Sequence, residues 1–422
     1  MKRRSIKAAA LLTVLAVLVS FAGCSASVPA QTGAAVKDLM KGISASKQIA
    51  DPRALEKNIS KASDFALKLL RTCSEKGKNT LVSPLSVLAA LSMTANGADN
   101  NTLAQMEAVL GMSKDELNEF YLSYSQALAE KKNGKLSLAN SIWFRDDDSF
   151  AVSKDFLQTN ADYFGAELYK VKFDGSDAAK NAINSWVKEK TDGMIPEILD
   201  KVPDNVIMYL INALAFDAEW QEVYNERQVS EGIFANADGT KKTVEFMYNQ
   251  ESQYLETPNA VGFIKDYKGG DYAFAALLPK EGCTVEDVVA ALDGEALSAL
   301  LASPMDAPVE TAIPKFEAEY STDLSKALAA MGMPEAFDPD KADFSKMGTG
   351  SGDIYIGRVL HKTYMAVNEK GTRAGAATAV EMLTKGALIM DTMQVYLDRP
   401  FVYMLIDRTT NLPIFIGQMN EL

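Results

Sequence analysis

The spacing of apolar positions predicts helices in the early part of this chain. From Leu55 to Leu70, apolar side chains recur every three or four residues, which predicts an amphipathic helix. Thr102-x-x-Gln105 and Ser113-x-x-Glu116 are both typical of capping boxes, and Gly111 between them is expected to end a helix. The chain should therefore open with helices that pack one face onto a core.

Strands are predicted mostly later in the chain. Val206–Phe216 is almost wholly apolar, which indicates a strand buried on both faces. Val395–Leu397, Phe401–Ile406 and Ile414–Met419 are further strand candidates, the last two joined across residues 409–411. Helices early and strands later favour an α+β fold in one domain.

One segment, Glu369–Met382, has a strand pattern but an unusual composition. Uncharged residues, beginning with Thr372, occupy one parity, whereas Arg373 and Glu381 occupy the other, so a strand here could bury one face. Its glycines and many alanines make it a poor permanent strand. This combination favours a loop that can enter a sheet. Considered alone, the segment would also fit an edge strand or an Ala-rich helix.

The first 50 residues look like a targeting region. Lys2–Arg4 are basic and Ala8–Val19 are apolar but too short to span a bilayer, so residues 1–23 are predicted to be a signal peptide. They end in Phe21-Ala22-Gly23-Cys24, which resembles a bacterial lipobox despite Phe21, so Cys24 is the expected lipidation site. Ordinary secretory cleavage, after Ala30 for example, is the alternative. Residues 24–50 would then be a tether and 51–422 the folded domain.

Composition narrows the partners. A hydrophobic content of 47% is ample for a large core, and a net charge of −13 argues against nucleic acid or an anionic membrane surface as the main partner. After processing, Cys73 and Cys283 remain, and we expect two separate core thiols rather than a disulfide. We expect membrane attachment only through a lipid on Cys24.

Catalysis by this chain is not expected. His361 is the single histidine, so any Ser-His or Cys-His arrangement would have to use it. Ser83 precedes Pro84 with no Lys three residues on, and the sequence contains no Gly-x-Ser-x-Gly, P-loop or His-Glu-x-x-His motif. One His, two Cys and carboxylates at no recognisable spacing do not predict zinc. We therefore expect no catalytic residues, no cofactor and no metal.

A family resemblance gathers these signals. The stretch Gly371–Thr378 resembles the hinge of a serpin reactive-centre loop, and serpin-like blocks run in the family's order from about residue 55 to the end. These blocks are Asn79–Met93, Leu138–Phe144, Ile183–Ile195, Leu210–Phe216, Ile313–Phe316, Arg399–Tyr403 and Phe415–Gln418. The resemblance implies a serpin domain with a large main sheet, smaller sheets and an exposed reactive-centre loop at about residues 369–394.

The resemblance implies a serine protease inhibitor that acts by suicide-substrate trapping. A serine protease, or in some family members a cysteine protease, attacks the loop and forms an acyl-enzyme, and the freed hinge then inserts into the main sheet. The partner is held in a covalent 1:1 complex, and the inhibitor is expected to be a monomer. The hinge residues that carry the resemblance are Glu369, Gly371, Thr372, Arg373, Ala374, Gly375, Ala376, Ala377 and Thr378.

The resemblance also assigns two further groups of residues. His361 matches the shutter histidine beneath the main sheet, and its implied partners are Asn212, Ser83 and Ser86. Trp220 resembles the breach tryptophan near the point where the hinge begins to insert. The plain alternatives are a lone histidine without a switching role and a tryptophan that only packs in the core.

The scissile bond depends on how the loop is counted. The family's usual spacing from Glu369 places it at Lys385-Gly386, which would suit a trypsin-like protease. Counting back from Pro400 places it near Ile389-Met390, which would suit an elastase- or chymotrypsin-like pocket, because this loop is about four residues longer than usual. Hinge length governs insertion, so we prefer Lys385, and we expect cleavage within Met382–Met390.

The hinge composition favours inhibition. Its residues from Thr372 to Thr378 are small apart from Arg373, whose parity keeps it outside the sheet. A non-inhibitory serpin with a binding or chaperone-like role is the alternative, and an unrelated lipoprotein enzyme is a second. We expect an exported protein, either anchored at the cell surface or secreted.

Overall fold

The first helix forms where the apolar spacing predicts it. In this computed structural model, which describes residues 36–47, 51–147, 150–174, 177–202, 206–350, 354–372 and 392–422, α1 spans Pro52–Cys73. Asp51 caps its start by accepting a hydrogen bond from the backbone N–H of Arg53, and Phe65 is buried in the core. The described helices are α1, α2 (Pro84–Ala95), α3 (Asn100–Leu110), α4 (Lys114–Ala129), α5 (Lys154–Phe164), α6 (Asp177–Lys190), α7 (Val285–Ala290), α8 (Gly294–Ala302) and α9 (Ser325–Met331), with 3-10 turns η1 (Glu226–Gln228) and η2 (Pro334–Phe337).

Two of the three predicted helix boundaries are confirmed. Ser113 and Glu116 form a complete capping box at the start of α4, and Gly111 ends α3 in the left-handed region at φ 74°. The capping box at Thr102 is wrong, because α3 begins at Asn100 and Thr102 lies inside the helix. Its hydroxyl instead accepts a hydrogen bond from the backbone N–H of Asp343.

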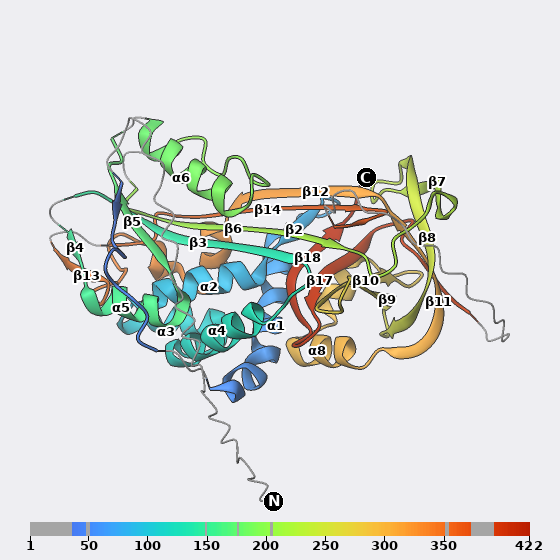
Figure 1. Ribbon diagram of the computed structural model, residues 1–422, viewed down its shortest axis with the longest axis horizontal. Helices are drawn as coiled ribbons and strands as arrows, with labels where there is room; N and C mark the ends of the chain where they lie inside the picture. Colours follow the sequence, from blue (N-terminus) through green and yellow to red (C-terminus); the bar gives the residue numbers. More distant parts are fainter. Residues whose placement is uncertain are drawn as a thin grey trace, which may run out of the picture. The chain divides into compact units, whose positions relative to one another are not determined.

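The main sheet holds the strands around which the fold is organised. Its seven described strands run in the order β1 (Lys37–Asp38), β5 (Glu167–Val171), β3 (Lys135–Arg145), β6 (Met208–Glu219), β15 (Gly371–Thr372), β14 (Arg358–Asn368) and β12 (Phe316–Asp323). The predicted apolar strand is β6, which is buried along nearly its whole length because α2 lies on one face of the sheet and α6 on the other (Figure 1).

A second sheet contains the predicted C-terminal strands. Its described path is β16 (Met393–Tyr396), β11 (Met305–Pro314), β8 (Lys241–Glu256), β9 (Ala260–Asp266), β10 (Tyr272–Pro279), β17 (Phe401–Asp407), β18 (Leu412–Met419) and β2 (Thr80–Val82), and β7 (Val229–Ala235) pairs with β8. A two-stranded pair joins β13 (Gly348–Gly350) to β4 (Phe150–Val152). Helices plus a large mixed sheet and further sheets confirm the predicted α+β fold.

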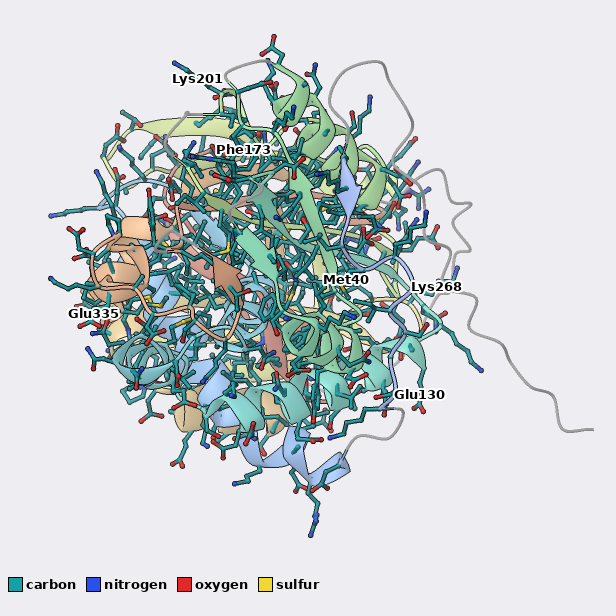
Figure 2. The ribbon with its side chains drawn as sticks, turned by 90° about the vertical axis from the view of Figure 1, so that its left-hand side faces the viewer. Met40, Glu130, Phe173, Lys201, Lys268 and Glu335 are labelled. Carbon is teal, nitrogen blue, oxygen red and sulfur yellow. The ribbon has the colours of Figure 1, made fainter. Side chains whose placement is uncertain are left out.

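Part of the predicted tether, residues 24–50, lies against the domain. Lys37–Asp38 pair with β5 at the edge of the main sheet, and Figure 2 labels Met40 on the segment that follows. Leu39, Met40 and Ile43 pack against the core, and Lys47 bonds Glu119. The spacing of these three apolar residues explains the difference, because it gives the segment a face that can be buried.

Cys73 and Cys283 are free thiols, but they do not lie in the core as predicted. Cys73 and Cys283 are partly exposed rather than fully buried, and they form no disulfide. Burial raises the pKa of the Cys73 thiol to about 12, so this thiol stays protonated.

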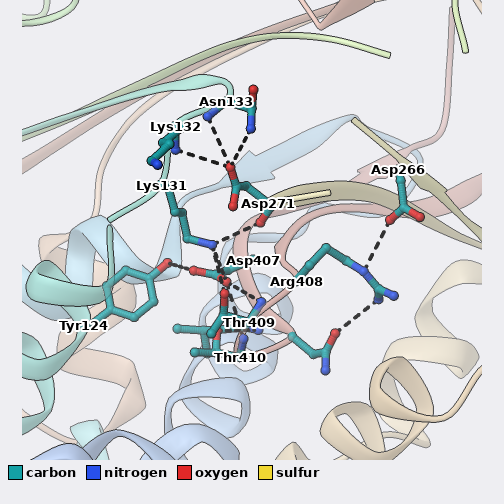
Figure 3. A network of polar contacts seen from close by, with 12 residues as sticks. Tyr124, Lys131, Lys132, Asn133, Asp266, Asp271, Asp407, Arg408, Thr409 and Thr410 are labelled. Atoms are coloured by element: carbon teal, nitrogen blue, oxygen red, sulfur yellow. Dashed lines mark hydrogen bonds and ion pairs between the residues drawn. The ribbon is translucent and has the colours of Figure 1, made fainter. Parts of the chain in front are cut away.

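A buried ion pair joins the segment after α4 to the second sheet. The Nζ atom of Lys131 lies 2.9 Å from Asp407, and both side chains are almost fully buried (Figure 3). Asp407 also accepts a hydrogen bond from the hydroxyl of Tyr124, and Arg408 beside it pairs with Asp266. This network fixes α4 and the start of β3 against the turn between β17 and β18.

Candidate functional site

The start of the predicted hinge lies inside the main sheet. Gly371–Thr372 form β15, which pairs with β6 on one side and β14 on the other. Beyond this point β6 and β14 pair directly and in parallel, through residues 209–215 and 358–364. We call this direct pairing the seam (Figure 1). A strand that extended β15 would have to open the seam along its length.

Both residues of β15 are held tightly. A Cβ atom on Gly371 would lie 2.0 Å from the carbonyl oxygen of Ala218, so the close approach of the two backbones requires glycine here. The family resemblance placed Gly371 in the hinge, and the structure adds this steric reason for a glycine. Thr372 is fully buried, and its hydroxyl bonds the hydroxyl of Tyr267.

Trp220, the predicted breach residue, lies against the residues that lead into β15. Its backbone N–H donates to the carbonyl of Lys370 at 2.9 Å, and its indole Nε1 donates to the carbonyl of Asn368 at 2.8 Å. Tyr224 holds the same turn by donating its backbone N–H to the carbonyl of Glu369. The Trp220 ring is stacked on Tyr267 with 4.4 Å between centroids, so packing and hydrogen bonding both fix it.

Glu369, in the predicted hinge, forms an ion pair with the residue before β12. Its carboxylate lies 3.0 Å from the Nζ atom of Lys315, which also pairs with Glu245. Lys315 directly precedes β12, the edge strand that pairs with β14. Lys315 was not among the predicted site residues, although it lies within the Ile313–Phe316 block.

The predicted shutter residues meet across the seam. His361 on β14 faces Asn212 on β6, with 2.6 Å between His361 Nδ1 and Asn212 Oδ1. The backbone N–H of Ser83 donates to His361 Nε2 at 3.1 Å. Since Nε2 accepts, the imidazole proton lies on Nδ1 and donates to Asn212. Ser83 also caps α2, where its Oγ accepts from the backbone N–H of Ser86.

The histidine is buried and neutral. His361 is fully buried, and desolvation lowers its pKa to about 3. Nδ1 donates a hydrogen bond to Asn212 on β6, and Nε2 accepts one from Ser83, the residue before α2. The hydrogen bond between His361 and Asn212 crosses the seam, so it must break when β6 and β14 separate.

Asn140 belongs to this cluster and was not predicted. Its Oδ1 accepts a hydrogen bond from Asn212 Nδ2 at 2.9 Å and from the hydroxyl of Ser86 at 3.2 Å. It lies on β3, opposite Asn212 in the ladder. The available signal was a polar residue in the middle of the apolar Leu138–Phe144 block, where it needs a buried partner.

Several predicted site residues lie outside the described part of the chain. They are the rest of the hinge (Arg373, Ala374, Gly375, Ala376, Ala377 and Thr378), both candidate scissile bonds (Lys385-Gly386 and Ile389-Met390) and Cys24. Within the described ranges, no group of three or more His, Cys, Asp or Glu side chains is placed to hold a metal ion. In the same ranges no helix combines the length and apolar character needed to cross a bilayer.

Known proteins resemble this chain in sequence. The family model described as Serpin (serine protease inhibitor) matches residues 60–422. Serpin B10 of Sorex araneus is 30% identical over 389 residues, which cover 85% of this chain and 96% of that protein.

Solved structures agree. The native state of the thermophilic serpin tengpin is 43% identical, with a TM-score of 0.85 over 92% of this chain and 100% of tengpin. Its latent state gives a TM-score of 0.77 over 89% of this chain and 100% of tengpin, at 44% identity. Thyroxine-binding globulin, in complex with thyroxine, is 26% identical, with a TM-score of 0.76 over 86% of this chain and 99% of that protein. The chain belongs to the serpin family.

Proposed function

We propose that this protein inhibits serine-type endopeptidases by suicide-substrate trapping. The observation that carries the proposal is the position of Gly371–Thr372, which already occupy the first two residues of a strand between β6 and β14. Apart from Arg373, the residues that follow as far as Thr378 are small, so they can continue that strand. Families with this fold include protease inhibitors, which supports the same reading.

The proposed mechanism begins with cleavage of the loop. The target protease attacks the bond after Lys385, its serine becomes acylated, and the new amino terminus at Gly386 departs with the C-terminal part of the loop. The acylated segment from Thr372 onward then extends β15 through the seam. At roughly 3.3 Å per residue, inserting Thr372 to Lys385 carries the attached protease about 40–50 Å. That movement distorts the protease before deacylation, leaving a covalent 1:1 complex.

Hydrogen bonding and burial drive the insertion. In the uncleaved chain, β6 and β14 form one ladder of hydrogen bonds along the seam. An inserted strand would replace it with two ladders, one to each of these strands. Each additional ladder hydrogen bond contributes about 0.5–1.5 kcal/mol net. A strand of about a dozen residues that also buries one face makes insertion strongly favourable. The uncleaved protein is thus a kinetically trapped state, whose lifetime is set by a rate.

A non-inhibitory serpin is the second candidate. Thyroxine-binding globulin shares the fold and was solved with bound thyroxine, so the fold alone does not require protease trapping. The outcome of cleavage distinguishes the two candidates, because a non-inhibitory serpin is cleaved without forming a complex with the protease. An enzyme is disfavoured, since the single histidine is fully buried with both ring nitrogens bonded inside the protein.

The site of action is part of the proposal. The basic and apolar N-terminal residues and the lipobox-like Cys24 support export, with a lipid anchor at Cys24 or release after cleavage further along. Expression of the full chain and of Cys24→Ala in a bacterial host tests this. If the wild type is found in the membrane fraction and Cys24→Ala is not, the result supports the lipid anchor. Equal release of the two proteins contradicts it.

The inhibitory proposal is tested by incubating the full chain separately with a trypsin-like and an elastase-like serine protease. We expect an SDS-stable complex near the summed masses, together with a released C-terminal peptide whose first residue identifies the scissile bond. A start at Gly386 supports Lys385, and a start at Met390 supports the alternative bond. Cleavage without a complex by both proteases, over a range of ratios, would favour the non-inhibitory function.

A further inference from the structure

A buried lysine lies beneath the residues that hold the hinge. The side chain of Lys265, near the end of β9, is 2% exposed, and its Nζ atom is 2.7 Å from the carboxylate of Glu251 on β8. The same Nζ atom lies 4.7 Å from the ring centroid of Tyr224 and 5.5 Å from that of Trp220. Three side chains from two parts of the fold therefore meet around one ammonium group.

Such a charge is expensive to bury and needs its partners. Burial raises the pKa of Glu251, and Glu222 and Asp266 raise it further, whereas Lys265 lowers it. The pair borders a cavity of about 530 Å³. Its lining includes Glu222, Glu251, Lys265 and Asp266. An apolar residue would fill the position of Lys265 at lower cost, so its placement calls for a role beyond packing.

The rings of Trp220 and Tyr224 belong to a segment that is hydrogen-bonded to the turn before β15. Trp220 and Tyr224 use their backbone N–H groups to bind the carbonyls of Lys370 and Glu369, as described above. Gln221, between them in sequence, donates its backbone N–H to the carbonyl of Asp266, the residue after Lys265. Residues 220–224 thus contact the second sheet on one side and the hinge on the other.

We propose that Lys265 is a positioning residue that holds residues 220–224 in place and thereby keeps Gly371–Thr372 inserted before any protease acts. The inference rests on the proposed function and adds a determinant of its efficiency. Insertion competes with deacylation once the acyl-enzyme has formed. A hinge that already occupies its first two positions starts that competition ahead, so Lys265 raises the fraction of proteases that are trapped.

The test separates this role from simple stabilisation. Lys265→Met leaves Glu251 buried without its cation, so it lowers stability as well as trapping. The double variant Lys265→Met with Glu251→Leu leaves neither charge unpaired and should recover stability, but it has no cation over the rings. Lys265→Arg keeps both contacts. Lys268→Met is the matched control, because Lys268 (labelled in Figure 2) is 68% exposed and also forms an ion pair, with Glu219.

The first readout is the number of inhibitor molecules consumed per protease trapped. We expect this number to rise about fivefold in both variants that carry Lys265→Met, which is the effect of a cation–π contact at the lower end of its usual strength. It should stay at the wild-type value in Lys265→Arg and Lys268→Met. A double variant that recovers both stability and wild-type trapping would overturn the proposal, because Lys265 would then matter only as a counter-ion.

The second readout needs no protease. Hydrogen exchange of peptides that cover residues 365–372 should be faster in the double variant than in the wild type, since β15 leaves its place between β6 and β14 more often. Unchanged exchange there would also overturn the proposal. If the wild type traps no protease while exchange still responds to Lys265, the inhibitory function fails and the positioning of the hinge stands.

Discussion

The backbone of Gly371 lies so close to the carbonyl oxygen of Ala218 that a Cβ atom on Gly371 would be 2.0 Å from it. This approach is possible because β15 lies between β6 and β14, where Gly371 is paired with Glu219 and Asn368. The two-residue strand β15 therefore depends on the absence of a side chain at one position, and in the proposed mechanism it is the first step of strand insertion.

Gly371→Ala is expected to displace β15 from the sheet. Forcing a methyl group into this contact costs about 1–3 kcal/mol, which is enough to expel a two-residue strand. Trapping should then fall, and most of the variant should be released as cleaved chain. The ratio of complex to cleaved chain on a denaturing gel measures this. Thr372→Ser keeps the hydroxyl that bonds Tyr267 and serves as control, so equal losses in both variants would argue against the steric explanation.

Acid should weaken the uncleaved protein through His361. Its pKa is about 3 in the folded chain but about 6.5 when unfolded, so below pH 6.5 the unfolded chain binds a proton that the folded chain excludes. Stability is therefore fully present above that pH and falls as the pH decreases, by about 2 kcal/mol at pH 5. Urea unfolding at pH 7.5 and at pH 5 measures the change.

The pH effect should depend on this one residue. His361→Gln removes the titrating group, so the difference in unfolding free energy between pH 7.5 and pH 5 should shrink by about 2 kcal/mol even though the variant is less stable at both. If the pH dependence of the unfolding free energy is the same in His361→Gln as in the wild type, it comes from carboxylates elsewhere in the chain.

Asn140→Leu should destabilise the seam although Asn140 is not part of the predicted shutter. The change leaves Asn212 Nδ2 and the Ser86 hydroxyl without their shared acceptor, at a cost of about 1–3 kcal/mol. The free energy of unfolding measures this. Ser86→Ala removes the hydroxyl that Asn140→Leu leaves without an acceptor. The double variant should therefore lose less unfolding free energy than the sum of the losses in the two single variants. Strict additivity would contradict a shared network.

The N-terminal segment should stabilise the domain. Removing residues 1–47 deletes β1, the apolar contacts of Leu39, Met40 and Ile43, and the pair between Lys47 and Glu119, whereas removing residues 1–35 keeps them. We expect the longer deletion to lower the thermal midpoint and the shorter one to leave it unchanged. Equal midpoints in the two truncated chains would show that the contacts contribute nothing to stability.

The sequence predicted elements whose signal is local. The amphipathic spacing of α1, the capping box at Ser113 and the apolar run of β6 each express a preference of a few neighbouring residues, and the structure contains all three. The capping pattern at Thr102 failed because a tertiary contact with Asp343 uses its hydroxyl. A pattern of two residues does not show which partner the fold will bring.

Site residues divide in the same way. Ser83, Ser86, Asn212, His361 and Trp220 carried a family pattern, and the structure brings the first four together around the seam. Lys265 and Glu251 meet only because β8 and β9 pair in the second sheet while residues 220–224 leave the main sheet. No spacing along the chain records such a meeting, so it had to come from the structure.

The central claim is that the hinge inserts between β6 and β14 once the loop is cut. The most direct measurement compares the thermal unfolding of the uncleaved chain with that of a chain cleaved within Met382–Met390, alongside Thr372→Arg. Insertion predicts that the cleaved wild type stays folded at temperatures that unfold the uncleaved chain. Thr372→Arg should gain no such resistance, because position 372 is fully buried in β15, and a charged side chain there would keep the hinge out of the sheet before and after cleavage. A cleaved wild type that unfolds at the uncleaved temperature would contradict the account.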